Sequence, residues 1–349
     1  MRLPFFVQVG HFLHVLGVVR GYFALVEGIG LCWEDELHML LKIIILWRIV
    51  KLMPMKRFVF MAMALLLAVT VNAQDIQQKY EEAVKLLNSD TDGAKAFIEQ
   101  WGKEDPKNPE LYSLWFNYYF AKSLQSVVEL SPEPAANANG FVITDSTGKK
   151  VGYLQERPFY NDTLLQMAFS WLDKGIAANP DRLDFYFGKA TAALRADKDR
   201  VCVETVVKAM DRAQIIGTKW IWTFGESRES EPNLLTECVQ DFFISLYQKG
   251  NMEQAQALIE AAAARYPGNI MYISNAGILA LTKGDLNKAL DKFLQAEKLD
   301  MKDHVVLLNI AYTYKELGDK AKAKKYYKKV IKYCSPEIAA QAEQLMQEL

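Results

Sequence analysis

Histidine is the side chain that general-base catalysis, nucleophile activation and zinc binding most often require, and it is scarce in this sequence. The sequence has four histidines, and three of them lie near its start: His11, His14 and His38. Beyond that point, a Ser-His-Asp or Cys-His arrangement would depend on His304 alone. The paired histidine and cysteine ligands of a zinc site are also missing. We therefore predict that the protein is not an enzyme and has no catalytic, metal-binding or cofactor-binding residues.

Two other motifs that could carry chemistry have simpler interpretations. Gly148-Lys149-Lys150 lacks both the Ser or Thr after the lysine and the earlier glycine of a phosphate-binding loop. Asp145-Ser146-Thr147-Gly148 has the composition of a tight turn. After residue 73 the cysteines are odd in number and form no Cys-x-x-Cys pair: Cys202, Cys238 and Cys334. This pattern argues against a disulfide framework and leaves open one bridge with one free thiol.

The charges of the chain are nearly balanced, with 41 lysines and arginines against 42 aspartates and glutamates. Nucleic-acid-binding proteins usually have a basic face, so we expect no nucleic-acid partner. One dense basic stretch, Lys320–Lys329, is interpreted as the solvated face of a helix. The alternative is a docking patch for an acidic partner.

The elements that position the remaining side chains repeat with a constant period of about 34 residues. The pairs Gly250-Asn251, Gly284-Asp285 and Gly318-Asp319 keep this spacing, and so do Ala255, Ala289 and Ala323. Three contiguous units follow: Thr236–Asn269, Ile270–Asp303 and His304–Glu337. A glycine in the left-handed conformation ends the first helix of each unit, and the Asn or Asp after it caps the second helix. Asn269 and Asp303 are placed to cap the first helix of the next unit.

These units resemble the tetratricopeptide repeat. Their first helices contain Ala276-Gly277 with Ala280 and Ile310-Ala311 with Tyr314, and their second helices contain the aromatic residues Phe293 and Tyr327. Met301 departs from the family pattern, which usually has proline there, and Pro336 falls one position late. The resemblance covers residues 236–337 and implies an all-α, right-handed solenoid of helical hairpins.

Upstream, residues 74–235 are expected to form an irregular region of the same kind, followed at the far end by a C-terminal helix over 338–349. Helices are predicted over Ile76–Leu87, Gly93–Trp101, Leu111–Val128, Arg182–Ala196 and Arg200–Ile215. Residues 141–154 contain β-forming residues on both sides of a turn and predict a small β-hairpin insertion. The long loop Gly217–Asn233 contains Trp220 and Trp222, which either pack over neighbouring helices or offer a platform for a peptide or glycan.

In the tetratricopeptide family the first helices line a concave groove that binds another protein or peptide. The resemblance carries this role onto fourteen positions: Glu237, Gln240, Ile244 and Tyr247; Met271, Ser274, Asn275, Ile278 and Leu281; and Val305, Leu308, Asn309, Tyr312 and Lys315. The family's clamp for a C-terminal carboxylate is not expected, because Gln240, Ile244 and Val305 stand at its positions. In the alternative interpretation, the groove is filled by the chain's own C-terminal helix, Pro336–Leu349, or by a neighbouring repeat.

The N-terminal region resembles an export signal that is preceded by extra sequence. Met55-Lys56-Arg57, an uncharged run and Val71-Asn72-Ala73 have the form of a secretory signal peptide cleaved after Ala73. Residues 1–54 are then expected to be an extension from a mis-assigned start. A membrane anchor at Pro4–Val19 or Met39–Met53 is the alternative, although charges or histidines interrupt both stretches.

Together these patterns predict a periplasmic scaffold or assembly factor of the cell envelope that binds a polypeptide in the groove. The competing hypothesis is an envelope enzyme or glycan-binding protein whose site lies near the hairpin and the Trp220 loop. A deep pocket with convergent carboxylates would favour that second hypothesis.

Overall fold

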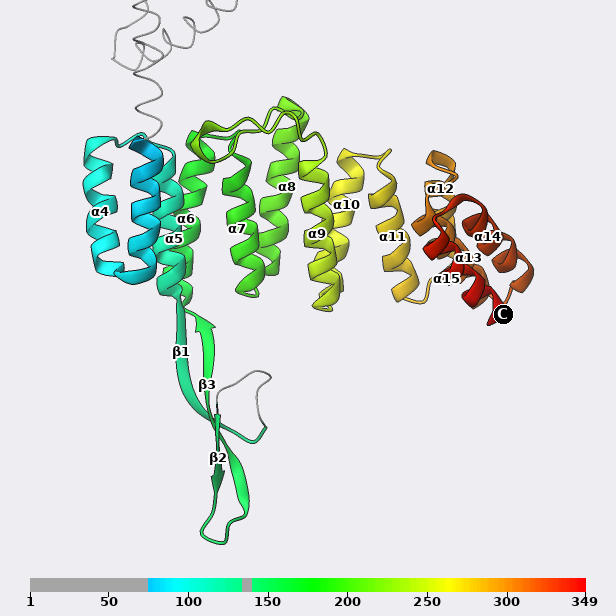
Figure 1. Ribbon diagram of the computed structural model, residues 1–349, viewed down its shortest axis with the longest axis horizontal. Coiled ribbons are helices and arrows are strands. Elements are labelled where there is room, and N and C mark those ends of the chain that lie inside the picture. Colours follow the sequence, from blue (N-terminus) through cyan, green and yellow to red (C-terminus); the bar gives the residue numbers. More distant parts are fainter. Residues whose placement is uncertain (1–74, 134–139) are drawn as a thin grey trace, which may run out of the picture. The chain divides into compact units, whose positions relative to one another are not determined.

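The computed structural model describes residues 75–133 and 140–349 (Figure 1). The predicted signal peptide, the upstream extension and the possible membrane anchor all lie outside the described residues. Within the described ranges, no helix combines the length and the apolar character needed to cross a bilayer.

Helices that are consecutive along the chain pack against one another, mostly as antiparallel pairs (Figure 1). This arrangement confirms the predicted all-α solenoid of helical hairpins. After a helix over residues 75–89, the helices are α4 (Thr91–Glu104), α5 (Glu110–Ser123), α6 (Asp162–Ala178), α7 (Leu183–Arg195), α8 (Asp199–Ile216), α9 (Leu234–Gln248), α10 (Met252–Arg265), α11 (Ile270–Thr282), α12 (Leu286–Leu299), α13 (His304–Glu316), α14 (Lys320–Tyr333) and α15 (Pro336–Gln347).

The turns between paired helices have the predicted chemistry. Gly250, Gly284 and Gly318 have φ angles of 76°, 78° and 81°, a region in which a side chain would be strained. The residue after each glycine caps the following helix, as when Asp285 Oδ1 accepts a hydrogen bond of 3.0 Å from the Lys288 backbone N–H. Asn269 caps α11 in the same way, with a distance of 3.2 Å to the Tyr272 backbone nitrogen.

Small side chains allow the paired helices to approach closely. Ala255, Ala289 and Ala323 are fully buried in the second helices α10, α12 and α14. Gly277 of α11 faces the ring of Phe293 in α12, and an ideal Cβ on this glycine would lie 2.5 Å from Phe293 Cε1. This contact leaves no room for a side chain at position 277, so the close packing of α11 and α12 requires glycine there.

The predicted helix Leu111–Val128 is wrong at its C-terminal end. Helix α5 stops at Ser123, and the chain continues as strand β1 (Leu124–Ser131). This strand pairs antiparallel with β3 (Lys150–Tyr160), which also pairs with β2 (Gly140–Thr144), giving the order β1-β3-β2. Pairing along a partner far away in the sequence overrides the local helical pattern of Leu124–Leu130.

The sheet is inserted between the two helices of one hairpin, α5 and α6, which pack on each other. The Asn161 N–H donates to the Ser123 carbonyl over 2.7 Å, so the two strands that leave and re-enter the hairpin are joined at its base. The predicted hairpin over 141–154 corresponds to β2, its turn and the first part of β3. Figure 1 shows the sheet extending beyond the ends of α5 and α6.

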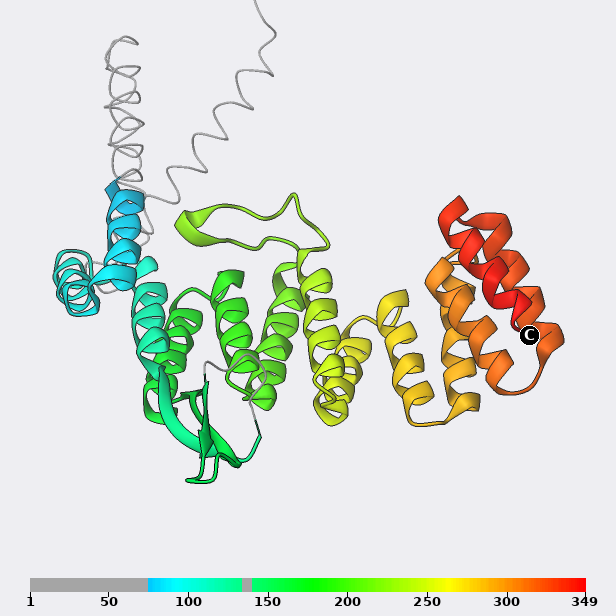
Figure 2. The ribbon, with the colours of Figure 1, turned by 60° about the horizontal axis from the view of Figure 1, so that its bottom comes forward.

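The loop between α8 and α9 packs on the helices, as the first of the two interpretations predicts. Trp220 is 3% exposed, and its ring lies 6.0 Å from that of Tyr186. Figure 2 shows the loop running back across the ends of the preceding helices. It reaches the helix over 75–89, where Phe224 makes an edge contact with Tyr80 at a centroid distance of 5.3 Å.

Candidate functional site

The first helices α9, α11 and α13 carry the fourteen residues expected to bind a partner, and we call this set the first-helix face. Two hydrogen bonds join α9 and α11 at this face. Asn275 Nδ2 donates to Gln240 Oε1 over 2.5 Å, and the Tyr247 and Thr282 hydroxyls lie 2.8 Å apart. Asn275 is only 3% exposed, so its amide is used within the protein.

One unit further along, the equivalent residues form no such hydrogen bond. Ser274 stands one repeat period after Gln240, and Asn309 stands one period after Asn275. The shorter serine leaves both groups unpaired, since Ser274 Oγ and Asn309 Nδ2 are buried atoms without a hydrogen-bond partner in the described part of the chain. Each such group costs about 1–3 kcal/mol in lost hydration.

Apolar side chains flank these polar atoms on the same face. Ile244 is 39% exposed, Val305 is 47% exposed and Tyr312 is 44% exposed. Ile278 and Leu281 are partly buried against the core of α11 and α12, and Met271 is also half-buried. Glu237 lies on the solvent-exposed part of α9. The face therefore combines accessible apolar contacts with unpaired polar groups.

The C-terminal helix reaches the end of this face. Leu308 packs against a buried cluster that includes Ala342 of α15, and Lys315 Nζ lies 3.7 Å from Glu348 Oε2. The Lys320 ammonium also donates to the carbonyl of Leu349. The alternative in which the chain's own C-terminal helix provides cover thus applies to Leu308 and Lys315, whereas Val305 and Tyr312 stay exposed.

The histidine and two of the cysteines in the described part of the chain can be assessed for acid–base or nucleophilic chemistry. His304 is an exposed residue at the start of α13. Burial raises the pKa of the Cys202 thiol to about 12 and that of the Cys238 thiol to about 11. Both thiols are therefore protonated at neutral pH and are weak nucleophiles. Across the described ranges, no group of three or more His, Cys, Asp or Glu side chains is arranged to hold a metal ion.

A buried ion cluster, which the sequence did not reveal, lies near the Trp220 loop. Arg182 donates to Glu110 over 2.8 Å and to Asp184 over 2.6 Å, and the arginine and Glu110 side chains are almost fully buried. Burial opposes its charge, but its hydrogen bonds to Asp184 and Glu110 raise the pKa of Arg182. Glu110 also accepts from the Phe224 N–H of the loop over 2.9 Å. A cavity of about 510 Å³ borders Glu110 and Arg182, but the carboxylates are already used to hold the loop.

The β-sheet exposes several apolar side chains, and this feature was also missed. Val128 is 65% exposed, Leu130 is 66% exposed and Phe141 is 77% exposed. Residue pairing places Leu130 and Phe141 on either side of Leu154, on one face of the sheet. Exposed apolar patches of this kind often mark interaction surfaces.

A comparison with sequence models of protein families bears on these repeats. Residues 305–335 match the model described as tetratricopeptide repeat. This segment of the chain is one tetratricopeptide repeat. The match covers α14 and most of α13, and no curated protein sequence matches the chain.

Several solved structures are similar to this chain. YrrB, described as a TPR protein with an unusual peptide-binding site, is 13% identical, with coverage of 71% of this chain and 97% of YrrB and a TM-score of 0.36. PilW, described as a type IV pilus biogenesis factor, is 15% identical over 76% of this chain and 96% of its own, with a TM-score of 0.35. The type III secretion translocator chaperone SycD of Yersinia enterocolitica is 14% identical over 34% and 83%, with a TM-score of 0.31.

Proposed function

We propose that the protein is a non-enzymatic scaffold or assembly factor of the cell envelope that binds a polypeptide along the first-helix face. The observation that carries this proposal is the unpaired couple Ser274 and Asn309, whose equivalents Gln240 and Asn275 are bonded to each other. Both atoms are buried in the free protein, so binding must first expose them. A peptide backbone then offers both a carbonyl for Asn309 Nδ2 and an N–H for Ser274 Oγ. Forming these bonds on binding recovers the free energy lost by burying the two groups.

The apolar contacts of such a peptide come from the neighbouring exposed residues. Val305 and Tyr312 of α13, together with Ile244 of α9, remain accessible in the free protein. Desolvating each of them against an apolar side chain contributes about 25 cal/mol per Å² of buried apolar surface. The expected ligand is therefore a peptide with apolar side chains and a free backbone edge.

The geometry gives the competing hypothesis of an enzyme or glycan-binding site no support. The carboxylates that border the cavity near the Trp220 loop are already paired: Glu110 binds Arg182 and Asp181 binds Arg212. Asp184 also binds Arg182. Removing Arg182 would leave Glu110 and Asp184 buried without a counter-ion, so this arginine has a structural role.

The envelope location rests on the signal peptide predicted over residues 55–73. Mass spectrometry of the N-terminus of the native protein tests it, and the proposal predicts a mature chain that begins at Gln74. Peptides from residues 1–54 in that sample would contradict a start at Met55.

Site-specific photo-crosslinking in the native host tests the binding face. We expect a photoreactive amino acid at Val305 or Tyr312 to form adducts with one defined polypeptide, which mass spectrometry identifies. The matched control is the exposed Lys298 of the second helix α12, where no such adduct is expected. Equal adducts at all three positions, or none at Val305 and Tyr312, would refute the proposal. Leu308 is less suitable as a probe because it also packs against the C-terminal cluster.

A further inference from the structure

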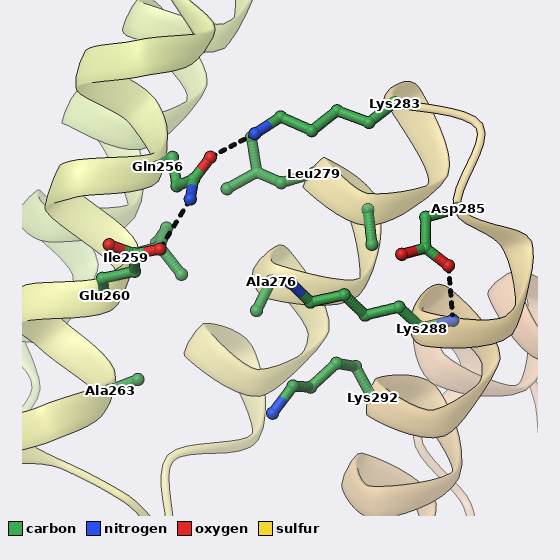
Figure 3. Close-up of a pocket in the computed structure, with 11 residues that line it drawn as sticks. Gln256, Ile259, Glu260, Ala263, Ala276, Leu279, Lys283, Asp285, Lys288 and Lys292 are labelled. Atoms are coloured by element: carbon green, nitrogen blue, oxygen red, sulfur yellow. Dashed lines mark hydrogen bonds between the residues drawn. The ribbon is translucent and has the colours of Figure 1, made fainter.

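A cavity of about 440 Å³ lies between α10, α11 and α12, away from the first-helix face (Figure 3). Its apolar lining includes Ile259 and Ala263 of α10 and Ala276 and Ala280 of α11. We call it the second-helix cleft. On α11, Ala276 and Ala280 point to roughly the opposite side from Ser274 and Ile278, because successive helical residues are about 100° apart. A ligand in the cleft would therefore leave the first-helix face free.

The same space is filled in the next unit of the repeat. Tyr314 and Tyr326 stand one repeat period after Ala280 and Lys292, and their rings stack with a centroid distance of 5.7 Å. The Tyr326 hydroxyl donates to Glu297 Oε2 over 2.9 Å. Glu297 itself stands one period after Ala263. Where this next unit has two tyrosines and a glutamate, the unit with the second-helix cleft has a lysine and two alanines. Because the alanines are small, the cleft stays open.

Three lysines surround the opening. Figure 3 shows Lys288 and Lys292 extending from α12 across the cleft, with Lys283 at its upper edge. None of the three pairs with a carboxylate in the described ranges; Lys283 donates to the Gln256 amide, and Lys292 Nζ lies 3.5 Å from Gln295 Oε1. The next unit shows the contrast, since Lys329 pairs with Glu297 over 2.5 Å.

The two acids at the edge of the cleft are already engaged. Glu260 Oε1 accepts from the Gln256 amide over 2.6 Å, and Asp285 accepts from the Lys288 backbone N–H as the cap of α12. The cleft therefore has an apolar floor and more ammonium groups than carboxylates, so it complements an aromatic ring that carries or adjoins a negative charge.

We propose that the second-helix cleft is a separate binding site for an acidic peptide segment, which inserts one aromatic side chain between α10 and α12. The ring takes the space that Tyr314 and Tyr326 occupy one unit later. Aspartates or glutamates beside it pair with Lys288 and Lys292. With the first-helix face occupied as well, one molecule of the protein holds two polypeptide segments on opposite sides of α11.

The test is selection of a random peptide library, displayed on phage, against the full chain. We expect enrichment of peptides with an aromatic residue flanked by aspartate or glutamate. Calorimetry then measures the affinity of one enriched synthetic peptide for Lys288→Glu/Lys292→Glu. Neither native lysine pairs with a carboxylate in the described part of the chain, so no such ion pair is lost; Lys292 Nζ lies 3.5 Å from Gln295 Oε1. The expected loss of affinity is about tenfold or more, because two attractive charge pairs near the surface become repulsive.

Ala280→Tyr supplies an independent test because it restores the ring found at Tyr314 and closes the cleft. The peptide is expected not to bind this variant, and circular dichroism shows whether the variant is folded. If it is unfolded, the charge-reversal variant alone tests the proposal. Val305→Glu is the matched control and should leave the affinity unchanged. The proposal would be overturned if the enriched peptides lacked acidic and aromatic residues, or if the peptide bound the charge-reversal variant with unchanged affinity. Peptides lost only with Val305→Glu would reject the cleft while supporting the first-helix face.

Discussion

Replacing Gly277 with alanine tests how tightly α11 and α12 are packed. The new methyl group would lie 2.5 Å from Cε1 and 2.8 Å from Cδ1 of Phe293. Because the Phe293 side chain is fully buried, its ring has no open space to move into. Overpacking of this kind costs about 1–3 kcal/mol. Removing a glycine from the middle of a helix returns about 1 kcal/mol, so we expect a net loss of roughly 0–2 kcal/mol.

Gly188→Ala in α7 is the matched control for this substitution. Its nearest neighbour would be Leu172 Cδ1 at 3.5 Å, an ordinary contact. This variant should therefore gain up to about 1 kcal/mol from helix propensity alone. Urea unfolding followed by far-ultraviolet circular dichroism measures both variants, and the difference between them isolates the overpacking cost. If Gly277→Ala stabilises the protein as much as Gly188→Ala does, the close contact with Phe293 is wrong.

Three further predictions concern stability and exposed groups. Ala289→Leu should lower the free energy of unfolding by about 1–3 kcal/mol, because Ala289 is fully buried between helices; an unchanged melting temperature would show that the repeat register is wrong. Stability should fall as the pH rises above about 9, because the Cys202 thiol, with a pKa of about 12, keeps its proton only in the folded state; Cys202→Val should reduce that slope, and an identical slope would contradict it. Phe141→Ser should leave the melting temperature unchanged and reduce binding of a hydrophobic dye, since this ring is 77% exposed; a marked drop in melting temperature would show that the ring is part of a core.

The repeat units were predictable because their signals are local. A left-handed glycine, a capping Asn or Asp and a small residue each act within a few positions of the chain, and Gly284, Asp285 and Ala289 perform these roles in the structure. The constant period then repeats the same local rules, so that helix pairs follow directly.

Long-range pairing explains what the sequence did not show. Strand β1 has a composition that also suits a helix, and only its pairing with β3 makes it a strand. The Glu110–Arg182 ion pair joins residues 72 positions apart, with no pattern that connects them. The second-helix cleft depends on which unit lacks large side chains, a difference that matters only once the helices are stacked.

The unpaired atoms of the first-helix face were also beyond sequence reasoning. Asn275 and Asn309 both suggest a peptide contact, yet Asn275 is already bonded to Gln240. Whether such an amide is available depends on the length of the side chain opposite, a glutamine in one unit and Ser274 in the next. The structure therefore separates the predicted residues whose polar atoms are bonded within the protein from those whose polar atoms are unpaired.

The most direct test of polypeptide binding at this face is the Ser274→Gln variant, measured for both stability and crosslinking at Tyr312. The longer amide should pair with Asn309 as Gln240 pairs with Asn275, which raises the free energy of unfolding by about 1 kcal/mol. Because the polar atoms are then satisfied internally, the yield of the polypeptide adduct at Tyr312 should fall. Gln240→Ser, which instead leaves Asn275 unpaired, is the matched control and should destabilise the protein by about 1–3 kcal/mol. If Ser274→Gln is stabilised and still forms the adduct in full yield, the unpaired atoms do not bind the partner, and the central claim fails.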